Sequence, residues 1–484
     1  MTMADEPLLV PGDTCWRIER AERFAFIVDA ADYYRLAKQA ILDARHAVML
    51  VGWDFDSRIE LEPDGATVEG PNRLGPFLKW AADRRPDVQF HLLKWNLGVI
   101  ETISRGETPV YLAQWMAKKN IRMKLDAAHP HMATHHQKIV VIDDGLAFCG
   151  GIDMTLGRWD TREHVEDDPR RRSPWGRQLG PWHDATTILT GPAAKALGEL
   201  ARDRWKRATD EDLPAPPPEP TAWPDGLKPH LEDVDVGIAR TYAAYGDHEQ
   251  VVEIEQLYLA AIAAAERTIY VESQYFASRQ IAEAVMKRLR EFDGPEIVIV
   301  NPEAQDGWLE ESTMGAARAK LLTHVKRADA RGRFRMYYPV TPNGTPIYVH
   351  AKIMIVDDRL LRVGSSNLNN RSMGFDTECD LAIEAADDET RAEILALRHD
   401  LLAEHLGASP DEVAAKIEET GSLIAAIEAF SADGRRLLEL PIRELGEVEE
   451  ALSETDFVDP ERPPGFWKRA RGKVKRRFRR RRMA

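Results

Sequence analysis

The sequence is poor in cysteine, and the three cysteines that it has form no pattern. Cys15, Cys149 and Cys379 are an odd number, lie far apart and include no Cys-x-x-Cys pair. Disulfide-rich secreted domains and cysteine-based zinc sites are therefore excluded, because both need closely spaced pairs of cysteine. We expect the three residues to be buried or incidental thiols.

The sequence also lacks a long hydrophobic run. The longest apolar stretch, from Leu257 to Ala265, is far shorter than the ~20 residues that a membrane-spanning helix needs. The first residues, MTMADEPLLVPGD, have neither the basic nor the apolar region of a secretory signal. With 44% hydrophobic and 30% charged residues, the composition is that of a globular protein in water, and we expect it in the cytoplasm.

Basic residues are most concentrated near the C-terminus. The net charge is -15, yet eleven lysines and arginines and no acidic residue lie between residues 468 and 482. The rest of the chain is strongly acidic, which argues against a broad nucleic-acid-binding surface. Because the basic tail also contains Phe466, Trp467 and Phe478, we expect it to attach the protein peripherally to an anionic membrane surface. A solvated tail and contact with nucleic acid are the alternatives.

A proline-dense stretch, EDLPAPPPEPTAWPDG, divides the chain. It cannot continue a helix or form a central strand, and it predicts a linker. The predicted parts are an N-terminal lobe (1–210), the linker (211–226), a C-terminal lobe (227–408), a helical cap that follows Ser409 and Pro410 (409–450), and an acidic-to-basic tail (451–484) that is polybasic from residue 468.

The same order of elements occurs on both sides of this linker. In each half a helix leads into an apolar strand, and further apolar strands alternate with helix-like stretches. The corresponding segments, first half before second, are AILDARHAVMLVGWDF and AIAAAERTIYVESQYF, DVQFHLLKW and EIVIVN, and IRMKL and FRMYY. The alternation predicts an α/β fold of two pseudo-symmetric lobes, each a mixed, mostly parallel sheet flanked by helices.

One motif is present in both halves. HQKIVVID begins at His136 and HAKIMIVD begins at His350, both with the pattern H-x-K-x-x-x-x-D. A single copy would be compatible with the solvent-facing start of a strand, but two copies at corresponding positions of a repeat indicate a function. Two imidazoles that meet across a two-fold axis suit one phosphodiester, because one can attack phosphorus while the other protonates the leaving alcohol.

Three further side chains are candidates for binding the phosphate. Lys138 and Lys352 of the motifs can hold its non-bridging oxygens and the charge of the transition state. Asn367 lies 17 residues after His350 and is expected to assist them.

We expect the aspartates of the repeat to lie away from the substrate. Asp143 and Asp357 complete the two catalytic motifs, but on a strand they are out of phase with the histidine and the lysine. We therefore expect them to hold the strand end through local hydrogen bonds. Asp153 stands in the first half where Asn367 stands in the second. Because a carboxylate would repel phosphate, we expect Asp153 to lie behind the residues that touch substrate.

Two other segments call for plainer interpretations. The charged insert from Arg162 to Pro181, interrupted by proline and glycine, favours a mobile loop over the site. The histidines of HPHMATHH suggest a metal only with further ligands at the right spacing, and we expect a loop at the mouth of the site instead.

Beyond the paired motifs, the chain resembles the phospholipase D superfamily over most of residues 8–408. The segments that carry the likeness are HHQK, PWHD, IYVESQYF, YVHAK and VGSSNLNNRSM. They are more similar to true phospholipases D than to the small nucleases of the superfamily. The resemblance implies a bilobal fold with one active site at the lobe interface, no required metal or other cofactor, and a phosphohistidine intermediate.

The resemblance also implies a division of roles. In this family the histidine of the first motif is usually the nucleophile, which would be His136, and His350 would then be the acid. An acidic residue past each motif orients the histidine of the opposite lobe. Asp184 of PWHD would serve His350, and Glu378 of FDTE would serve His136.

The resulting hypothesis is a phospholipase D that cleaves the headgroup phosphodiester of glycerophospholipids into phosphatidic acid and an alcohol. Transphosphatidylation would follow from the same intermediate, and we expect a monomer whose partners are its phospholipid substrate and the membrane surface. A cardiolipin-synthase-like phosphatidyltransferase is the first alternative. A nuclease is disfavoured by the acidic body, and an inactive scaffold is disfavoured by the completeness of both motifs.

Overall fold

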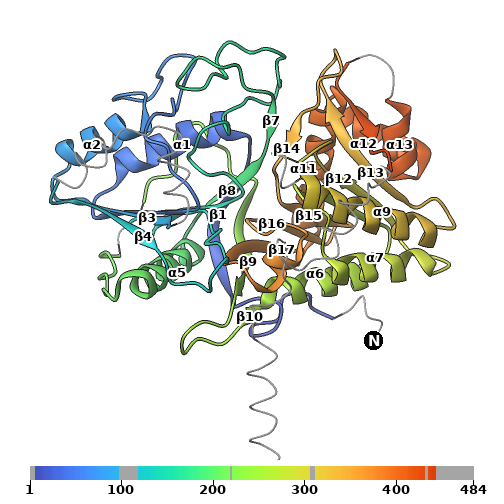
Figure 1. Cartoon of the computed structure of the whole chain (residues 1–484), viewed down its shortest axis with the longest axis horizontal. Coiled ribbons are helices and arrows are strands. Elements are labelled where there is room, and N and C mark those ends of the chain that lie inside the picture. The colour runs from blue at the N-terminus through green and yellow to red at the C-terminus, as the bar shows by residue number, and fades with distance from the viewer. Residues whose placement is uncertain (1–5, 97–117, 219–220, 306–310, 431–433, 443–484) are drawn as a thin grey trace, which may run out of the picture.

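One mixed sheet organises the described part of the chain, residues 6–96, 118–218, 221–305, 311–430 and 434–442. In the computed structural model this sheet has sixteen strands, and helices lie on both of its sides (Figure 1). The elements of the first half are β1 (Arg17–Val28), α1 (Ala30–Asp43), β2 (Ala47–Gly52), α2 (Leu74–Arg84), β3 (Gln89–Trp95), β4 (Ile121–Asp126), β5 (Ile139–Ile142), β6 (Leu146–Gly150), β7 (Trp182–His183), β8 (Ala185–Thr190) and α5 (Pro192–Thr209).

The second half repeats much of this series after the linker. Its elements are β9 (Leu231–Tyr242), β10 (Val251–Val252), α6 (Glu253–Ala264), β11 (Thr268–Glu272), α7 (Arg279–Arg290), β12 (Glu296–Val300), the π-helix η2 (Glu311–Gly315), α9 (Ala316–Ala328), β13 (Phe334–Val340), β14 (Tyr348–Val349), β15 (Ile353–Val356), β16 (Leu360–Gly364), α10 (Asn370–Gly374), β17 (Glu378–Glu384), α11 (Asp388–Leu406), α12 (Pro410–Thr420), α13 (Leu423–Ala429) and β18 (Arg436–Glu439).

Strand order is the clearest sign of the repeat. From the outside inwards the first half runs β4-β3-β2-β5-β6-β8-β1, and the second half runs β13-β12-β11-β15-β16-β17-β9. Corresponding strands occupy corresponding places. β1 pairs antiparallel with β9, so the two halves share one sheet instead of forming two. The predicted α/β class and the mixed sheet are confirmed.

The alternating pattern predicts mainly parallel pairing, and this part of the prediction is wrong. Among the described residues of the large sheet, only β2–β3, β3–β4, β11–β12 and β12–β13 pair in parallel. The other neighbours are antiparallel. For the pairs β5–β6 and β15–β16 the reason is a short connection, which allows only an antiparallel return.

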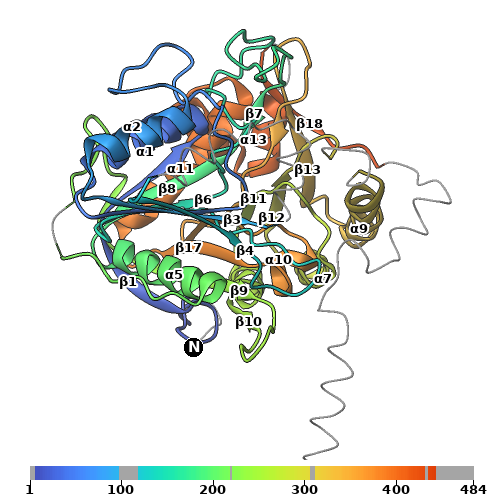
Figure 2. The ribbon, with the colours of Figure 1, turned by 60° about the vertical axis from the view of Figure 1, so that its left-hand side comes forward.

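The helices form two layers that follow the repeat. α5 and α11 contribute to one apolar cluster, whose members include Trp205 of α5 and Leu397 and Leu401 of α11. On the opposite face, α1 and α2 cover the first half, and α6, α7 and α9 cover the second. Figure 2 shows α1 and α2 on one side of β3 and β4 and α5 on the other. Strands between two helical layers are buried on both faces, which explains why β5 (IVVI) and β15 (IMIV) are apolar without alternation.

The residues after α11 form the predicted pair of short helices. α12 starts behind a capping box at Ser409. α13 is held against the sheet, because Glu296 of β12 accepts hydrogen bonds from Ser422 Oγ at 2.5 Å and Leu423 N at 2.7 Å. The predicted cap is not wholly helical, since β18 pairs with β13 at the sheet edge.

Some predicted segments are only partly described. Residues 443–450 of the predicted cap and the whole tail, 451–484, lie outside the described residues. The described residues of the linker, 211–218 and 221–226, form neither helix nor strand. No helix in the described ranges is both long enough and apolar enough to cross a membrane.

Two short strands connect the halves beside the large sheet. β7 and β14 pair in parallel, with Trp182 opposite Tyr348, and they stand side by side between the halves in Figure 1. The insert that leads into β7 is bonded to the preceding chain by a buried side chain. Arg171 is 2% exposed and donates to Asp160 at 2.6 Å. A segment whose composition favours a mobile loop is therefore tied down by a buried ion pair.

Candidate active site

The two motif segments lie where the halves meet. His136 and His350 each precede a central strand, β5 and β15. The amide of His136 donates to Thr377 O at 2.9 Å, and the amide of His350 donates to His183 O at 2.8 Å. Each motif is thus bonded through its backbone to the segment of the other half that carries the predicted acid.

His136 and Glu378 form the first dyad. Nδ1 of His136 lies 3.1 and 3.0 Å from the two carboxylate oxygens of Glu378, the first residue of β17. The hydroxyls of Ser365 and Ser372 donate to the same carboxylate at 2.6 and 2.7 Å. Glu378 is fully buried, whereas 16% of the His136 side chain is exposed. Since Nδ1 faces the acid, Nε2 is the nitrogen left for a substrate.

His350 and Asp184 form the second dyad. Nδ1 of His350 lies 2.6 Å from Oδ2 of Asp184, which directly follows β7. The other carboxylate oxygen accepts from Ala185 N at 2.8 Å, and the amide of Asp184 donates to Asp29 at 3.0 Å. Each dyad joins a histidine of one half to an acid of the other, which is the crosswise arrangement that the resemblance implies.

Burial governs the charge of both histidines. It lowers the pKa of His136 and of His350 well below the usual 6.5, and the ammonium groups of Lys138 and Lys352 lower both further. Both rings are therefore neutral in the free protein at neutral pH. With Nδ1–H directed at a carboxylate, Nε2 keeps its lone pair, which is the form that a nucleophile or a base needs.

The two acids differ in their pKa. Burial raises the pKa of Glu378 to about 8, although the hydroxyls of Ser365 and Ser372 act against this. Burial raises the pKa of Asp184 only to about 6, because Lys352 and the amide of Ala185 favour the carboxylate. Burial thus disfavours the ionised form of Glu378 more strongly than that of Asp184. A positive charge arriving on His136 would lower the pKa of Glu378 again.

The two lysines have one kind of partner in common, because each donates to the backbone carbonyl of its own motif histidine. Lys138 has an acid as a second partner. Nζ of Lys138 lies 3.0 Å from Oδ2 of Asp153, and both side chains are buried. Lys352 donates to the carbonyl of His350, and burial lowers its pKa to about 7. Both ammonium groups reach the same site, since each lowers the pKa of both histidines.

Asn367 and Asp153 occupy equivalent places but differ in their bonding. Asp153 is satisfied by Lys138 and by the N–H of Trp53 at 3.1 Å. Asn367 is 4% exposed, and its Oδ1 is buried without a hydrogen-bond partner among the described residues. An unpaired buried amide oxygen is unfavourable. The structure therefore places Asp153 behind Lys138 and leaves Asn367 available to a ligand.

The aspartates that end the motifs lie away from the dyads. Each accepts three backbone N–H groups of the turn between a helix and the following strand, at 2.6–2.8 Å. The donors are Arg45, His46 and Ala47 for Asp143, and Glu266, Arg267 and Thr268 for Asp357. Both aspartates have a left-handed backbone, with φ of 52° and 53°. They hold the fold of the motif and not the substrate, as their phase on the strand predicts.

Three side chains beside the second dyad have no signal in the paired motifs. Trp182 stacks on Tyr348 with ring centroids 4.5 Å apart, and its ring lies 5.2 Å from that of His350. The guanidinium of Arg158 lies 4.1 Å from the centroid of the same indole. The aromatic pair belongs to PWHD and YVHAK, so its presence at the strand pair could be inferred only once the two segments were known to meet.

A chain of buried ionisable side chains begins next to the acid of the second dyad. His183, next to Asp184, is bonded through Nε2 to Glu272 at 2.6 Å and through Nδ1 to Glu404 at 2.7 Å. Glu272 continues to His405 at 3.0 Å, and Glu404 continues to His164 at 3.1 Å. We call this the buried charge chain; its members are Asp160, His164, His183, Glu272, Glu404 and His405.

With Asp29, part of this chain has the composition of a metal site: Asp29, His164, His183 and Glu404. In both histidines, however, each ring nitrogen already lies within 3.1 Å of a carboxylate oxygen. Burial alone would lower their pKa, but the acids raise that of His164 to about 9 and that of His183 well above its usual value. Protonated rings therefore satisfy the cluster, and it serves to fix β7.

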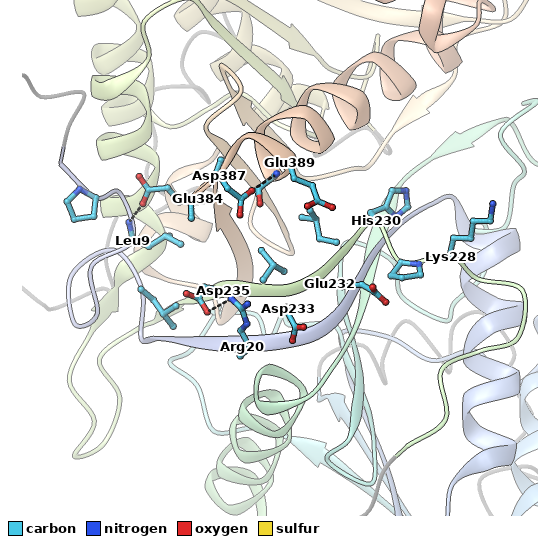
Figure 3. A pocket seen from close by; sticks show the side chains of 18 residues that line it. Leu9, Arg20, Lys228, His230, Glu232, Asp233, Asp235, Glu384, Asp387 and Glu389 are labelled. Carbon is cyan, nitrogen blue, oxygen red and sulfur yellow. Dashed lines mark hydrogen bonds and ion pairs between the residues drawn. The ribbon is translucent and has the colours of Figure 1, made fainter.

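A large hollow elsewhere on the molecule is a poor phosphate site. It has a volume of about 920 Å³ and lies where β1 and β9 approach the start of α11 (Figure 3). Its lining includes Glu232, Asp233, Asp387 and Glu389 and no member of either dyad. These acidic side chains would repel an anion.

The chain is similar to known families over much of its length. A family model described as Phospholipase D matches residues 40–215, and one described as Cardiolipin synthase, PLD-like domain, matches residues 258–396. Each match contains one of the two motif histidines.

Curated relatives extend this similarity. Phospholipase D A of Dictyostelium discoideum is 26% identical over 438 residues, which cover 75% of this chain and 32% of that protein. Phospholipase D alpha 2 of Oryza sativa subsp. japonica is 25% identical over 537 residues, covering 78% of this chain and 65% of that protein. The chain therefore spans only part of the length of these relatives.

A solved structure supports the fold. Phosphatidylserine synthase of Haemophilus influenzae Rd KW20 matches with a TM-score of 0.52 at 13% identity, over 85% of this chain and 96% of that chain. The paired motifs, the two family models and the curated relatives agree, and the chain belongs to the phospholipase D superfamily.

Proposed function

We propose that the protein is a phospholipase D, which hydrolyses the headgroup phosphodiester of a glycerophospholipid to phosphatidic acid and an alcohol. The crosswise pair of dyads is the observation that carries this proposal. One histidine cannot act as nucleophile and leaving-group acid in the same step, and the two dyads supply both. Family membership indicates a phosphodiesterase-type enzyme, and the curated relatives named phospholipase D support a lipid substrate.

The reaction would proceed in two steps. Nε2 of His136 attacks phosphorus and the P–O bond to the headgroup breaks, while His350 gives a proton to the leaving oxygen. His350 then takes a proton from water, the water oxygen attacks phosphorus and the P–N bond breaks. Phosphatidic acid leaves and His136 is restored. An alcohol in place of water would give transphosphatidylation.

His350 must carry a proton when the first step begins. Its pKa is low in the free site because of burial and the nearby cations, Lys352 first among them. A bound phosphodiester anion would offset those cations and raise the pKa of His350. Asp184, ionised at pH 7, would stabilise the resulting imidazolium.

The test is to incubate the protein with vesicles of phosphatidylcholine, phosphatidylethanolamine and phosphatidylglycerol, with and without ethanol, and to identify the products by mass spectrometry. We expect phosphatidic acid, and phosphatidylethanol when ethanol is present. His136→Ala is the matched inactive control. Cleavage of DNA or RNA together with no attack on any of the three lipids would overturn the proposal.

A phosphatidyltransferase is the second candidate, favoured by the family model that matches the second half. Its chemistry is the same until the phosphohistidine is resolved by a lipid alcohol. Phosphatidylglycerol as the sole lipid decides between the two. Cardiolipin as the main product would favour the transferase, and phosphatidic acid as the main product would favour the hydrolase.

We also propose that the basic tail holds the protein to an anionic membrane surface. The tail lies outside the described residues, so the proposal rests on its sequence: each lysine or arginine near such a surface contributes roughly 1 kcal/mol. A chain ending at Arg462 should sediment less with anionic vesicles than the full chain, yet keep its rate on a short-chain soluble lipid. Equal sedimentation of the two chains would contradict the proposal.

A further inference from the structure

Arg158, at the edge of the second dyad, is a cation that forms no ion pair among the described residues. Its guanidinium lies 4.1 Å from the centroid of the Trp182 indole, and its Nε is buried with no hydrogen-bond partner among the described residues. No carboxylate in the described ranges forms an ion pair with it. Arg158 as a whole is half-buried, and a guanidinium with an unsatisfied buried N–H at the edge of the site is a candidate for binding an anion.

The guanidinium belongs to the same electrostatic environment as the reacting groups. The indole beneath it lies 5.2 Å from the ring of His350. The charge of Arg158 lowers the pKa of His350 and of Lys352, and it favours the ionised form of Asp184. Arg158, His350 and Lys352 therefore share one environment, in which Asp184 and Glu378 are the acids that act on Lys352.

The equivalent region of the first dyad is balanced. Lys138 has its own carboxylate, Asp153, at 3.0 Å. The arginine that follows the corresponding loop of the second half, Arg371, is bonded through two nitrogens to Asp376 at 2.9 and 2.7 Å. Asn367 stands where the first half has Asp153, so the second motif lacks that carboxylate, and Arg158 has no acidic partner in the described structure. The excess of positive charge is thus on the side of His350.

We infer that Arg158 is a ligand of the substrate phosphate and that, with Lys352, it holds the non-bridging oxygens on the His350 side of the site. This inference rests on the proposed function, because it assigns the charge of the phosphodiester to one half of that same site. A guanidinium keeps its charge at every pH of interest, and its planar fork can donate to two phosphate oxygens at once. The stack on Trp182 would hold the fork in that orientation.

The test compares Arg158→Gln and Arg158→Lys with the wild-type chain. Arg172→Gln is the matched control, because Arg172 is an exposed arginine of the nearby insert that donates only to the carbonyls of Pro169 and Gly176. Two quantities are measured: the dissociation constant of inorganic phosphate by calorimetry, and kcat/KM on a short-chain phosphatidylcholine.

We expect Arg158→Gln to weaken phosphate binding and to lower kcat/KM by about 10- to 100-fold each, the range of a charged hydrogen bond. Arg158→Lys should lose less, and millimolar guanidinium should restore part of the activity of Arg158→Gln. Arg172→Gln should match wild type in both quantities. A merely structural role for Arg158 would lower the melting temperature, leave phosphate affinity unchanged in the folded fraction, and allow no rescue; that result overturns the inference.

The two measurements separate this inference from the proposed function. If phosphate binds wild type and not Arg158→Gln while no lipid is cleaved, the phosphate ligand is upheld and the proposed function fails. If the lipid is cleaved and Arg158→Gln equals wild type in both quantities, the inference fails and the proposed function stands.

Discussion

The two dyads have the same chemistry but are held by different means. The carboxylate of Glu378 in the first dyad accepts from two neutral hydroxyls, those of Ser365 and Ser372. Asp184 in the second dyad is bonded to backbone and stands next to His183, the centre of the buried charge chain. The two dyads thus share the same kinds of reacting group and differ in the residues that surround them.

The difference matches the roles that the two histidines would have. Because Glu378, with a pKa of about 8, takes up a proton more readily than Asp184, it stabilises positive charge on His136 less and favours the neutral ring that a nucleophile needs. An ionised Asp184, with a pKa of about 6, favours an imidazolium on His350, as a leaving-group acid must be. Environments that separate the pKa values of two like groups are how one site assigns acid and base.

The largest expected effect tests which histidine is the nucleophile and which is the leaving-group acid. His136→Ala should lose about 10⁴-fold or more in kcat on every substrate, because no other group forms the covalent intermediate. His350→Ala should lose about 10²- to 10⁴-fold on phosphatidylcholine, and far less on a p-nitrophenyl phosphodiester, whose leaving group needs no proton. Initial rates with both substrates check this. If His136→Ala is the variant that recovers with the activated substrate, the roles are reversed.

The next effect concerns the acid of the second dyad. As pH falls through about 6, Asp184 takes up a proton and no longer stabilises an imidazolium on His350, so kcat/KM should fall on the acidic side with an apparent pKa near 6. Asp184→Asn should lower kcat/KM by about 10³-fold and abolish that inflection. Glu378→Gln should lower the rate and keep the inflection. An unchanged acidic limb in Asp184→Asn would show that another group controls it.

A smaller effect compares the supports themselves by stability. Glu404→Gln removes one charge from the buried charge chain, where loss of a partner costs ~3 kcal/mol or more. Ser365→Ala removes one neutral hydroxyl from Glu378 and should cost ~1–2 kcal/mol. Urea unfolding of both variants gives the two free energies of unfolding. An equal or smaller loss in Glu404→Gln would mean that the chain of charges does not stabilise β7.

Local pattern was sufficient for much of the fold and of the reacting groups. Apolar runs predicted β2 and β3 and their counterparts β11 and β12, because strands covered on both faces are continuous in hydrophobicity. The more mixed segments IRMKL and FRMYY predicted β4 and β13 by their place in the repeat. The paired motifs located His136 and His350. The crosswise acids came from the resemblance, since no local pattern relates Glu378 to a histidine in the other half.

What could not be predicted depends on contacts between distant segments. The halves are joined by the pairing of β1 with β9. Their sequences, RIERAERFAFIV and LEDVDVGIARTY, contain no pattern that predicts this pairing. Charged residues such as His183 and Glu404 are expected at the surface, yet they are buried because they neutralise one another across the fold. The antiparallel pairs β5–β6 and β15–β16 follow from short connections, whereas others, such as β2–β5 and β1–β8, join distant segments.

The smallest expected effect exchanges the charges that distinguish the two halves. Asn367→Asp puts a carboxylate at the position that corresponds to Asp153, and it should repel the phosphate. We expect kcat/KM to fall by about 10-fold or more, the effect of one misplaced charge in a partly desolvated site. Asp153→Asn should change kcat/KM by only about threefold, because an asparagine can still accept from Trp53 N and the phosphate is held on the other side. Steady-state rates on short-chain phosphatidylcholine measure both. If Asp153→Asn is the more damaging exchange, the first half holds the phosphate, and the excess charge beside His350 must serve some step other than binding.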